Sequence, residues 1–265
     1  MNVLGIVGSP RRERGRSHEI VSAILAGAHA AGATTDMLYL IDEEPQYCIH
    51  CGYSCFAEGD CAQEAAATLR SQRVDAADAL VLCAPVYCWQ PNGLTATLFD
   101  KVRLASKPWN RGTPSGRPAL GIALAGGTGT GVFPALQSIY AWLCLWKFRP
   151  LDPLPVTRFN MDRVLAEAEQ QGVALVRRGA QPFAGTAELL LTYDRLPYMD
   201  YGRVDEFRWL AQQILAGLRT RDTATSDDDE VGRLLAQAEA CATDGNAVGE
   251  MEHILEAYHR GASAW

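Results

Sequence analysis

Short apolar runs alternate with amphipathic stretches along the first two thirds of the chain. The runs at 3–7, 37–40, 79–84, 119–125 and 153–159 have the length and composition of strands, and apolar positions at helical spacing follow most of them. The run at 79–84 is apolar throughout, which is typical of a strand buried on both faces of a parallel sheet. This alternation predicts an α/β fold with a doubly wound, five-stranded parallel sheet.

Helix signals occupy the segments between these runs. Ser17 is the expected N-cap of a first helix, which stops at Gly32. Further helices are expected near 62–73, 92–104, 133–147, 162–178 and 204–218. After a polar linker at 220–230, two amphipathic stripes follow, one of Val231, Leu234, Leu235, Ala238 and Cys241 and one of Val248, Met251, Ile254, Leu255 and Tyr258. We therefore expect a domain at 1–220, with an insertion near 45–62, and a helical C-terminal extension at 221–265.

The formal net charge of −7 is concentrated in this extension. Residues 221–265 carry ten acidic and three basic side chains, whereas residues 1–220 carry 21 of each. This distribution lacks the basic surface that is typical of nucleic-acid-binding proteins. The first strand begins at once without a recognisable signal peptide, and no segment approaches the length of a membrane-spanning helix. The expectation is a cytoplasmic protein that binds neither nucleic acid nor membrane.

Four of the eight cysteines lie within 14 residues, as Cys48, Cys51, Cys55 and Cys61. In a reducing compartment, clustered cysteines indicate metal ligands or redox groups rather than disulfides. Four thiolates at this spacing, C-x2-C-x3-C-x5-C, favour one soft metal centre, either a [4Fe–4S] cluster or a zinc ion. A run that binds no metal is the third alternative. Cys83, in contrast, lies in an apolar run and is expected to be a buried structural thiol.

Three loops follow predicted strands, at 8–17, 84–92 and 126–131, where open α/β sheets bind ligands. The first combines hydroxyl groups, arginines and a helix N-terminus, which suit a phosphate, yet it is neither a G-x-G-x-x-G nor a Walker-type loop. The second offers aromatic and apolar groups for a flat ring, and the third is rich in glycine. Tyr193, Tyr198 and Tyr201 could cover such a pocket, but we favour simple packing of a long connection.

As an ordered set, these motifs resemble the NAD(P)H-dependent FMN reductase family. The set comprises Gly8-Ser9-Pro10-Arg11, Ala84-Pro85-Val86-Tyr87 and Ala125-Gly126-Gly127. The cysteine run resembles that of the iron–sulfur flavoproteins, a branch of the same family. The resemblance implies a flavodoxin-like fold, FMN as cofactor, and a [4Fe–4S] cluster on Cys48, Cys51, Cys55 and Cys61. It assigns FMN binding to Ser9, Arg11, Arg16, Ser17, Pro85, Val86, Tyr87, Cys88, Trp89, Asn92, Gly126, Gly127 and Thr128, with Tyr87, Cys88 and Trp89 as candidate catalytic residues.

The implied function is a flavin-dependent oxidoreductase that reduces a small organic acceptor or passes electrons between redox partners. The cluster would relay electrons to the flavin from a ferredoxin-type donor. Without a cluster, NAD(P)H would reduce FMN directly, as in an FMN or quinone reductase. A non-catalytic electron carrier and an interaction module without flavin are further alternatives. The resemblance also implies a homodimer or homotetramer, and the Cys88-Trp89 pair, which departs from the family pattern, leaves the acceptor unidentified.

Overall fold

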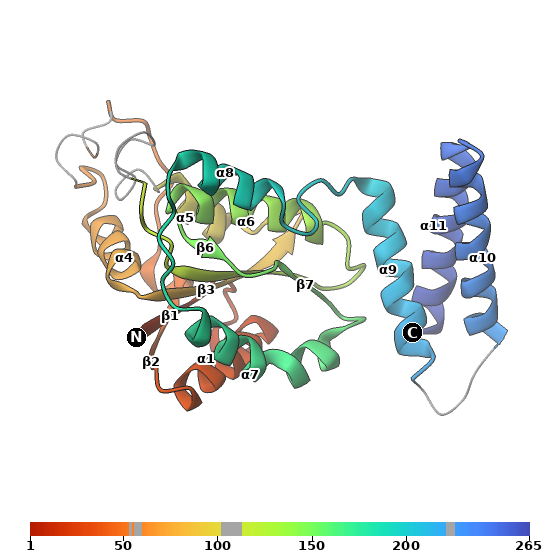
Figure 1. Ribbon diagram of the computed structural model, residues 1–265, viewed down its shortest axis with the longest axis horizontal. Coiled ribbons are helices and arrows are strands. Elements are labelled where there is room, and N and C mark those ends of the chain that lie inside the picture. The colour runs from red at the N-terminus through yellow and green to blue at the C-terminus, as the bar shows by residue number, and fades with distance from the viewer. Residues whose placement is uncertain (53–54, 56–59, 102–112, 221–225) are drawn as a thin grey trace.

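The computed structural model describes residues 1–52, 55, 60–101, 113–220 and 226–265. Its centre is a parallel sheet of β2 (Thr34–Tyr39), β1 (Asn2–Val7), β3 (Ala79–Tyr87) and β5 (Pro118–Ala125), in that order (Figure 1). At the far edge, β6 (Arg149–Pro150) pairs with the beginning of β5, and β7 (Leu154–Thr157) pairs with its carboxyl half. The strand order reverses between β1 and β3, as in flavodoxin-like sheets, which confirms the predicted fold class.

Helices cover both faces of the sheet because successive strand residues point to opposite sides. Val3 and Val7 face α1 (Arg16–Ala30) and α7 (Met161–Arg178), where they join one hydrophobic cluster. Leu4 and Ile6 belong to the cluster on the other face. That face is covered by α4 (Ala65–Ala76), α5 (Gly93–Asp100), α6 (Val132–Leu145) and α8 (Thr186–Asp194). Two short elements, η1 (Arg12–Arg14) and α2 (Leu40–Glu43), follow β1 and β2.

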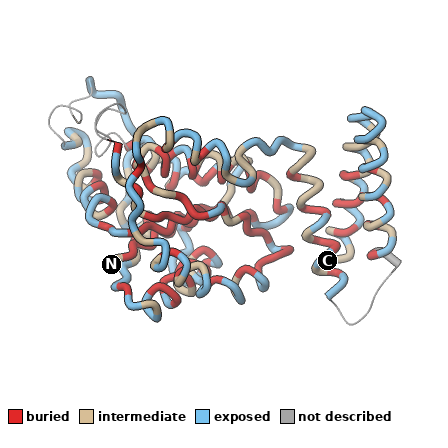
Figure 2. The backbone as a smooth tube through the Cα atoms, viewed as in Figure 1, coloured by how far each residue is buried: buried red, intermediate tan, exposed pale blue. Residues whose placement is uncertain are grey.

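The last three helices form a separate layer at one end of the molecule (Figure 1). They are α9 (Arg203–Leu218), α10 (Ser226–Thr243) and α11 (Ala247–Ala264), and their buried side chains share a third cluster with Phe159, which follows β7. Figure 2 shows the buried positions on the sides of these helices that face one another. The amphipathic stripes are confirmed at Val231, Leu234, Ala238 and Ile254, whereas Val248 is 70% exposed. The division at residue 220 stays a proposal, because α9 packs with α10 and α11.

Several predicted boundaries differ from the structure. Ser17 is not the N-cap of the first helix: Gly15 takes that position, and Ser17 lies buried inside the first turn of α1. The helix expected at 62–73 begins three residues later, and the strand expected at 153–159 is confined to β7. The helix expected at 92–104 is α5, and residues 102–104 lie outside the described part of the chain. The pattern missed β6 and α8. None of the described helices combines the length and the apolar composition that crossing a membrane requires.

Candidate functional site

The first loop joins β1 to α1 and keeps its two serines inside. Ser9 is buried, and its Oγ accepts a hydrogen bond from the Arg11 amide at 3.2 Å. Ser17 is also buried, and its side chain hydrogen-bonds the thiol of Cys83 on β3. Gly15 gives the N-terminus of α1 no side-chain cap, which leaves this positive end of the helix to an anion.

The arginines of this loop are not equivalent. Arg12 forms an ion pair with Asp42, and Arg16 donates to Glu19 at 2.7 Å. The hydrogen bond and charge of Glu19 raise the pKa of Arg16 further. Arg11 is exposed and enters no ion pair with any residue that the structure describes. Of the predicted phosphate ligands, Arg11 is therefore better placed to meet a ligand than Arg16.

The second loop is a tight hairpin between β3 and β4 (Gln90–Pro91), in which Tyr87 pairs with Gln90. Cys88 and Trp89 form its turn with φ of 49° and 67°. Positive φ at both central residues is the hallmark of a type I′ turn, which normally uses Asn or Gly. Two bulky residues in this region store backbone strain, a feature that concentrates at functional sites. Tyr87 is 53% exposed, and Cys88 is also exposed.

Asn92 connects the first and second loops. Its side-chain amide donates to the Gly8 carbonyl at 2.8 Å, and its Oδ1 accepts from the Thr95 hydroxyl at 2.7 Å. The same oxygen caps α5 through the Thr95 amide. Asn92 is almost wholly buried, so its hydrogen bonds connect the loops from the inside of the protein. Thr95, which the sequence analysis did not single out, takes part in the same hydrogen bonds.

The third loop follows β5 and lies against the second. Gly126 and Gly127 are exposed, and a Cβ at either would meet no protein atom within 4 Å. Gly131, with φ of +88°, approaches so closely that a Cβ would lie 2.6 Å from the Trp89 Cα. Only glycine fits both this conformation and this space. The three predicted loops therefore meet at one edge of the sheet, where the backbone of Gly126 and Gly127 is open to solvent.

Cys83 and the three tyrosines that were considered as a cover have structural contacts. Burial raises the pKa of Cys83 to about 12, so its thiol stays neutral at physiological pH, as expected of a structural cysteine. The Tyr193 hydroxyl donates to the Phe148 carbonyl at 2.8 Å. Tyr198 and Tyr201 pack on the ring of Phe133. The interpretation of these tyrosines as packing residues is thus the better one.

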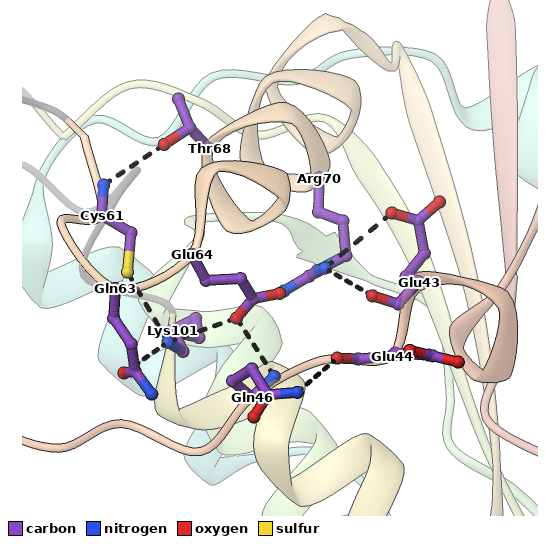
Figure 3. Close-up of polar contacts among 9 residues, drawn as sticks. All are labelled: Glu43, Glu44, Gln46, Cys61, Gln63, Glu64, Thr68, Arg70 and Lys101. Carbon is purple, nitrogen blue, oxygen red and sulfur yellow. Dashed lines mark hydrogen bonds and ion pairs between the residues drawn. The ribbon is translucent and has the colours of Figure 1, made fainter.

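Cys61, the last thiol of the cysteine run, contacts Thr68 of α4 and Lys101, which follows α5 (Figure 3). Its amide donates to the Thr68 hydroxyl at 3.3 Å, and Lys101 Nζ lies 3.6 Å from its Sγ. Lys101 also donates to Gln63 Oε1 at 3.2 Å and is itself only 6% exposed. A buried ammonium group therefore faces the last thiol of the run.

Glu64 lies at the centre of the surrounding charges (Figure 3). Its carboxylate pairs with Arg70 and with Lys101, the latter at 3.3 Å, and accepts from the Gln46 amide at 3.1 Å. Arg70 is 1% exposed and reaches the Glu43 carboxylate at 3.8 Å. Buried charges of this kind are stable only when they are paired, so this network fixes the position of Lys101 beside Cys61.

The other three thiols of the run act electrostatically on Cys55. Burial, followed by the nearby thiols of Cys51, Cys61 and Cys48, raises the pKa of Cys55. Thiols gathered in this way are chemically suited to an iron–sulfur or zinc centre. Among the described residues, which omit 53–54 and 56–59, no three His, Cys, Asp or Glu side chains form a group that could hold a metal ion. The donor chemistry fits such a centre, while its ligand set stays a prediction.

Sequence reasoning missed the contribution of the last helices to the loop edge. Glu206 of α9 is 1% exposed, and its Oε1 accepts from the Phe133 amide at 3.1 Å, at the start of α6. Burial raises the pKa of Glu206, while the amides at the start of α6 oppose that shift. The Tyr258 hydroxyl of α11 donates to the Thr128 carbonyl at 2.9 Å. No sequence motif marks either contact, since each joins residues far apart in the chain.

Comparison with known proteins connects this loop edge to a family. The family model described as NADPH-dependent FMN reductase matches residues 1–150. An iron–sulfur flavoprotein of Archaeoglobus fulgidus is 28% identical over 102 residues, which are 38% of this chain and 46% of that protein. One of Methanosarcina thermophila is 28% identical over 144 residues, which are 54% of this chain and 73% of that protein. The match therefore spans less than half the length of the Archaeoglobus protein.

A solved azoreductase structure is similar in fold, with a TM-score of 0.51 at 16% identity, over 67% of this chain and 100% of that one. The match of the family model to residues 1–150 confirms the resemblance drawn from the three loops. Since the family model covers more than half of the chain, the protein belongs to the NADPH-dependent FMN reductase family, whose members are flavin-dependent oxidoreductases.

Proposed function

We propose that the protein is an FMN-dependent oxidoreductase that reduces a small organic acceptor. The observation that carries this proposal is the meeting of the three loops at the carboxyl edge of the sheet, within the segment that the family model matches. Asn92 ties the first loop to the second, and the close approach of Gly131 to Trp89 ties the second to the third. A ligand bound there would contact all three.

The residues of this edge suit the parts of FMN in order. Arg11 and the uncapped N-terminus of α1 would hold the phosphate, with Ser9 shaping the loop beneath it. The exposed backbone of Gly126 and Gly127 would let a flat ring approach closely. The full set proposed to bind FMN is Ser9, Arg11, Arg16, Ser17, Pro85, Val86, Tyr87, Cys88, Trp89, Asn92, Gly126, Gly127 and Thr128.

When bound, FMN would supply the hydride and electron chemistry, with NADPH as the donor named in the family description. The protein would bind, orient and shield the ring. Tyr87, Cys88 and Trp89 would form the loop next to it, and the buried thiol of Cys83, with its pKa raised to about 12, would take no part as a nucleophile. No protein side chain needs to carry electrons in this scheme.

The proposed cluster is the finer part of this function. A [4Fe–4S] centre on Cys48, Cys51, Cys55 and Cys61 would relay electrons from a ferredoxin-type donor to the flavin. Three observations support it: the names of the two relatives, the effect of the other three thiols on the pKa of Cys55, and the Lys101 ammonium next to Cys61, which would balance the charge of a thiolate.

A plain NAD(P)H-dependent FMN or quinone reductase without a cluster is the alternative. The observation that favours it is that the described residues do not form a group able to hold a metal ion. A zinc ion on the same thiols would leave this alternative unchanged. A homodimer or homotetramer is proposed in either case.

Turnover and metal content separate these possibilities. The protein is purified anaerobically, its iron, sulfide and zinc are assayed, and NADPH or a reduced ferredoxin is added with a quinone in excess of the protein. Multiple turnovers support the oxidoreductase, whereas reduction limited to one equivalent per chain indicates an electron carrier. Four iron atoms per chain with matching sulfide support the relay. Zinc or no metal, together with turnover by NADPH, supports the plain reductase.

A further inference from the structure

The helices α9 and α11 hold the third loop from outside. Gly129 lies so close to α9 that a Cβ on it would be 2.9 Å from the Leu210 side chain. The Tyr258 hydroxyl of α11 donates to the Thr128 carbonyl at 2.9 Å. Glu206 of α9 accepts from the Phe133 amide, where α6 leaves the same loop. Since all three contacts reach the third loop or the start of α6 directly after it, α9 and α11 border the edge of the sheet at which the three loops meet.

Helix α9 also covers the second loop. The Arg203 guanidinium, in the first turn of α9, lies 3.8 Å from the centroid of the Trp89 ring. The Phe207 ring, one turn later, lies 6.3 Å from the Trp89 ring and 5.2 Å from that of Tyr258. Trp89 therefore lies against α9, while Tyr87 on the same hairpin is exposed. A planar molecule above this hairpin would meet aromatic side chains from both sequence regions.

Arg203 is the cation of this surface. It is exposed, and it forms no ion pair with a carboxylate among the residues that the structure describes. The two acidic residues that follow it in the chain are engaged with backbone amides: Asp205 accepts from Gly202 at 2.8 Å, and Glu206 accepts from Phe133 at 3.1 Å. Glu206 is also buried, and the charge of Arg203 acts on it with less effect on its pKa than its burial and its hydrogen bond with the Phe133 amide. A guanidinium group stacked on an indole keeps its donors available at the edges for a carboxylate or sulfonate.

We propose that α9 forms the outer wall of the acceptor site and that Arg203 selects planar aromatic acceptors that carry an anionic group. This inference rests on the proposed function, since it concerns the molecule that the flavin would reduce. Arg203 would bind the anionic group, and the aromatic surface of Trp89 and Phe207 would receive the ring. The acceptor class is therefore an aromatic carboxylate or sulfonate, such as an anionic quinone, in preference to its uncharged counterpart.

The test compares two redox-inert probes, naphthalenesulfonate and uncharged naphthalenemethanol, by calorimetry on the FMN-loaded full chain. Arg203→Gln should weaken binding of the sulfonate about tenfold to a hundredfold, because it removes a charge-assisted hydrogen bond, and should leave the alcohol unchanged. Arg178→Gln is the matched control. It makes the same change at an exposed arginine in the last turn of α7. The first turn of α7 follows the carboxyl end of β7, so Arg178 lies at the end of the helix that is farther from the loops. In turnover, Arg203→Gln should raise KM for a sulfonated naphthoquinone and not for the unsubstituted one.

Three results would overturn the inference. The first is a wild-type protein that binds neither probe. The second is an Arg203→Gln variant that binds both probes as the wild type does, and the third is a variant whose affinity falls equally for both probes. A wild-type protein that binds no FMN overturns the proposed function instead, and the acceptor site with it. A protein that binds and reduces FMN normally, but whose Arg203→Gln variant keeps the wild-type preference for the sulfonate over the alcohol, overturns only the role of Arg203.

Discussion

The molecule has α4 at one end and the layer of α9, α10 and α11 at the other (Figure 1). Beside α4, Cys61 contacts the Lys101 ammonium and the Thr68 hydroxyl, whereas α9 and α11 contact the third loop through aliphatic, aromatic and backbone groups. Near Cys61, the single carboxylate of Glu64 forms ion pairs with Arg70 and Lys101 and accepts a hydrogen bond from a backbone amide. On the helical side, the attachment is divided among Leu210, Glu206, Tyr258 and the cluster around Phe159.

The two regions differ in how much stability is lost when a single contact is removed. Removing one partner of a buried ion pair leaves an uncompensated charge, which costs more than the pair itself contributes. Removing one contact of a divided apolar attachment leaves the others in place. We therefore expect single substitutions to be most costly near the cysteine run, and the effects to become smaller toward the loops and the helical layer.

The largest effect is expected from Arg70→Met. Arg70 is 1% exposed and pairs with Glu64, which is 9% exposed, so the substitution leaves a buried carboxylate without its main partner. The free energy of unfolding should fall by about 3–5 kcal/mol, as measured by urea denaturation, and the protein should retain less iron when it is purified anaerobically. Arg73→Met, which breaks partly exposed pairs with Asp36 and Glu43 while the pair of Arg70 with Glu64 stays intact, is the control and should cost about 0–1 kcal/mol. Equal losses in the two variants would contradict the role given to this network.

The next effect tests the loop edge. Arg11→Ala should weaken FMN binding by about 1.5–3 kcal/mol, because a charge-assisted bond to the phosphate is lost. Arg14→Ala is the matched control, since it is exposed, lies in the same loop and was assigned no ligand contact. Flavin fluorescence titration measures both affinities. The assignment fails if Arg11→Ala binds FMN as the wild type does, or if both variants lose affinity equally.

Glu206 makes the attachment of the helical layer dependent on pH. Because burial raises its folded pKa above the ordinary value of 4.5, the stability it contributes is fully present below about pH 4.5 and is lost as pH rises through the folded pKa. The stability of the wild type relative to Glu206→Gln should therefore be highest in acid and should fall toward neutral pH. Urea denaturation of both proteins from acid to neutral pH measures this difference. A difference that stays constant, or that grows with pH, would contradict the raised pKa.

The smallest effect is expected at the strained turn of the second loop. Cys88 has a positive φ, which costs a side chain about 1–2 kcal/mol and costs glycine little. Cys88→Gly should therefore raise the unfolding free energy by about 1 kcal/mol. The same substitution at Cys241, a helical position, should lower stability instead. A destabilised Cys88→Gly variant would mean that the thiol makes contacts whose loss outweighs the relief of strain.

The sheet could be predicted from sequence because its central strands are buried on both faces and leave continuous apolar runs. Helix α8 could not, since three consecutive leucines occupy it and only Leu189 is buried, while Leu190 and Leu191 are exposed. Such a run has no helical stripe for periodicity to detect. Ser17 was misplaced as an N-cap because the pattern does not reveal that its hydroxyl turns inward to Cys83.

The three loops could be predicted because each follows a strand of a parallel sheet, and parallel strands end at one edge. The contacts of α9 and α11 with these loops could not be predicted. The bond between Tyr258 and Thr128 joins residues 130 positions apart, and the stacking of Arg203 on Trp89 joins two segments that no motif links. The clustering of the cysteines was visible from the sequence, but the buried charges of Lys101 beside Cys61 and of Arg70 behind Glu64 were not.

An equilibrium titration of the purified wild-type chain with FMN, followed by flavin fluorescence and the visible spectrum, tests the central claim most directly. The account predicts saturation at one FMN per chain, with a bound flavin that NADPH or a reduced ferredoxin bleaches under anaerobic conditions. A chain that does not bind FMN, or whose bound flavin neither donor can reduce, would contradict it.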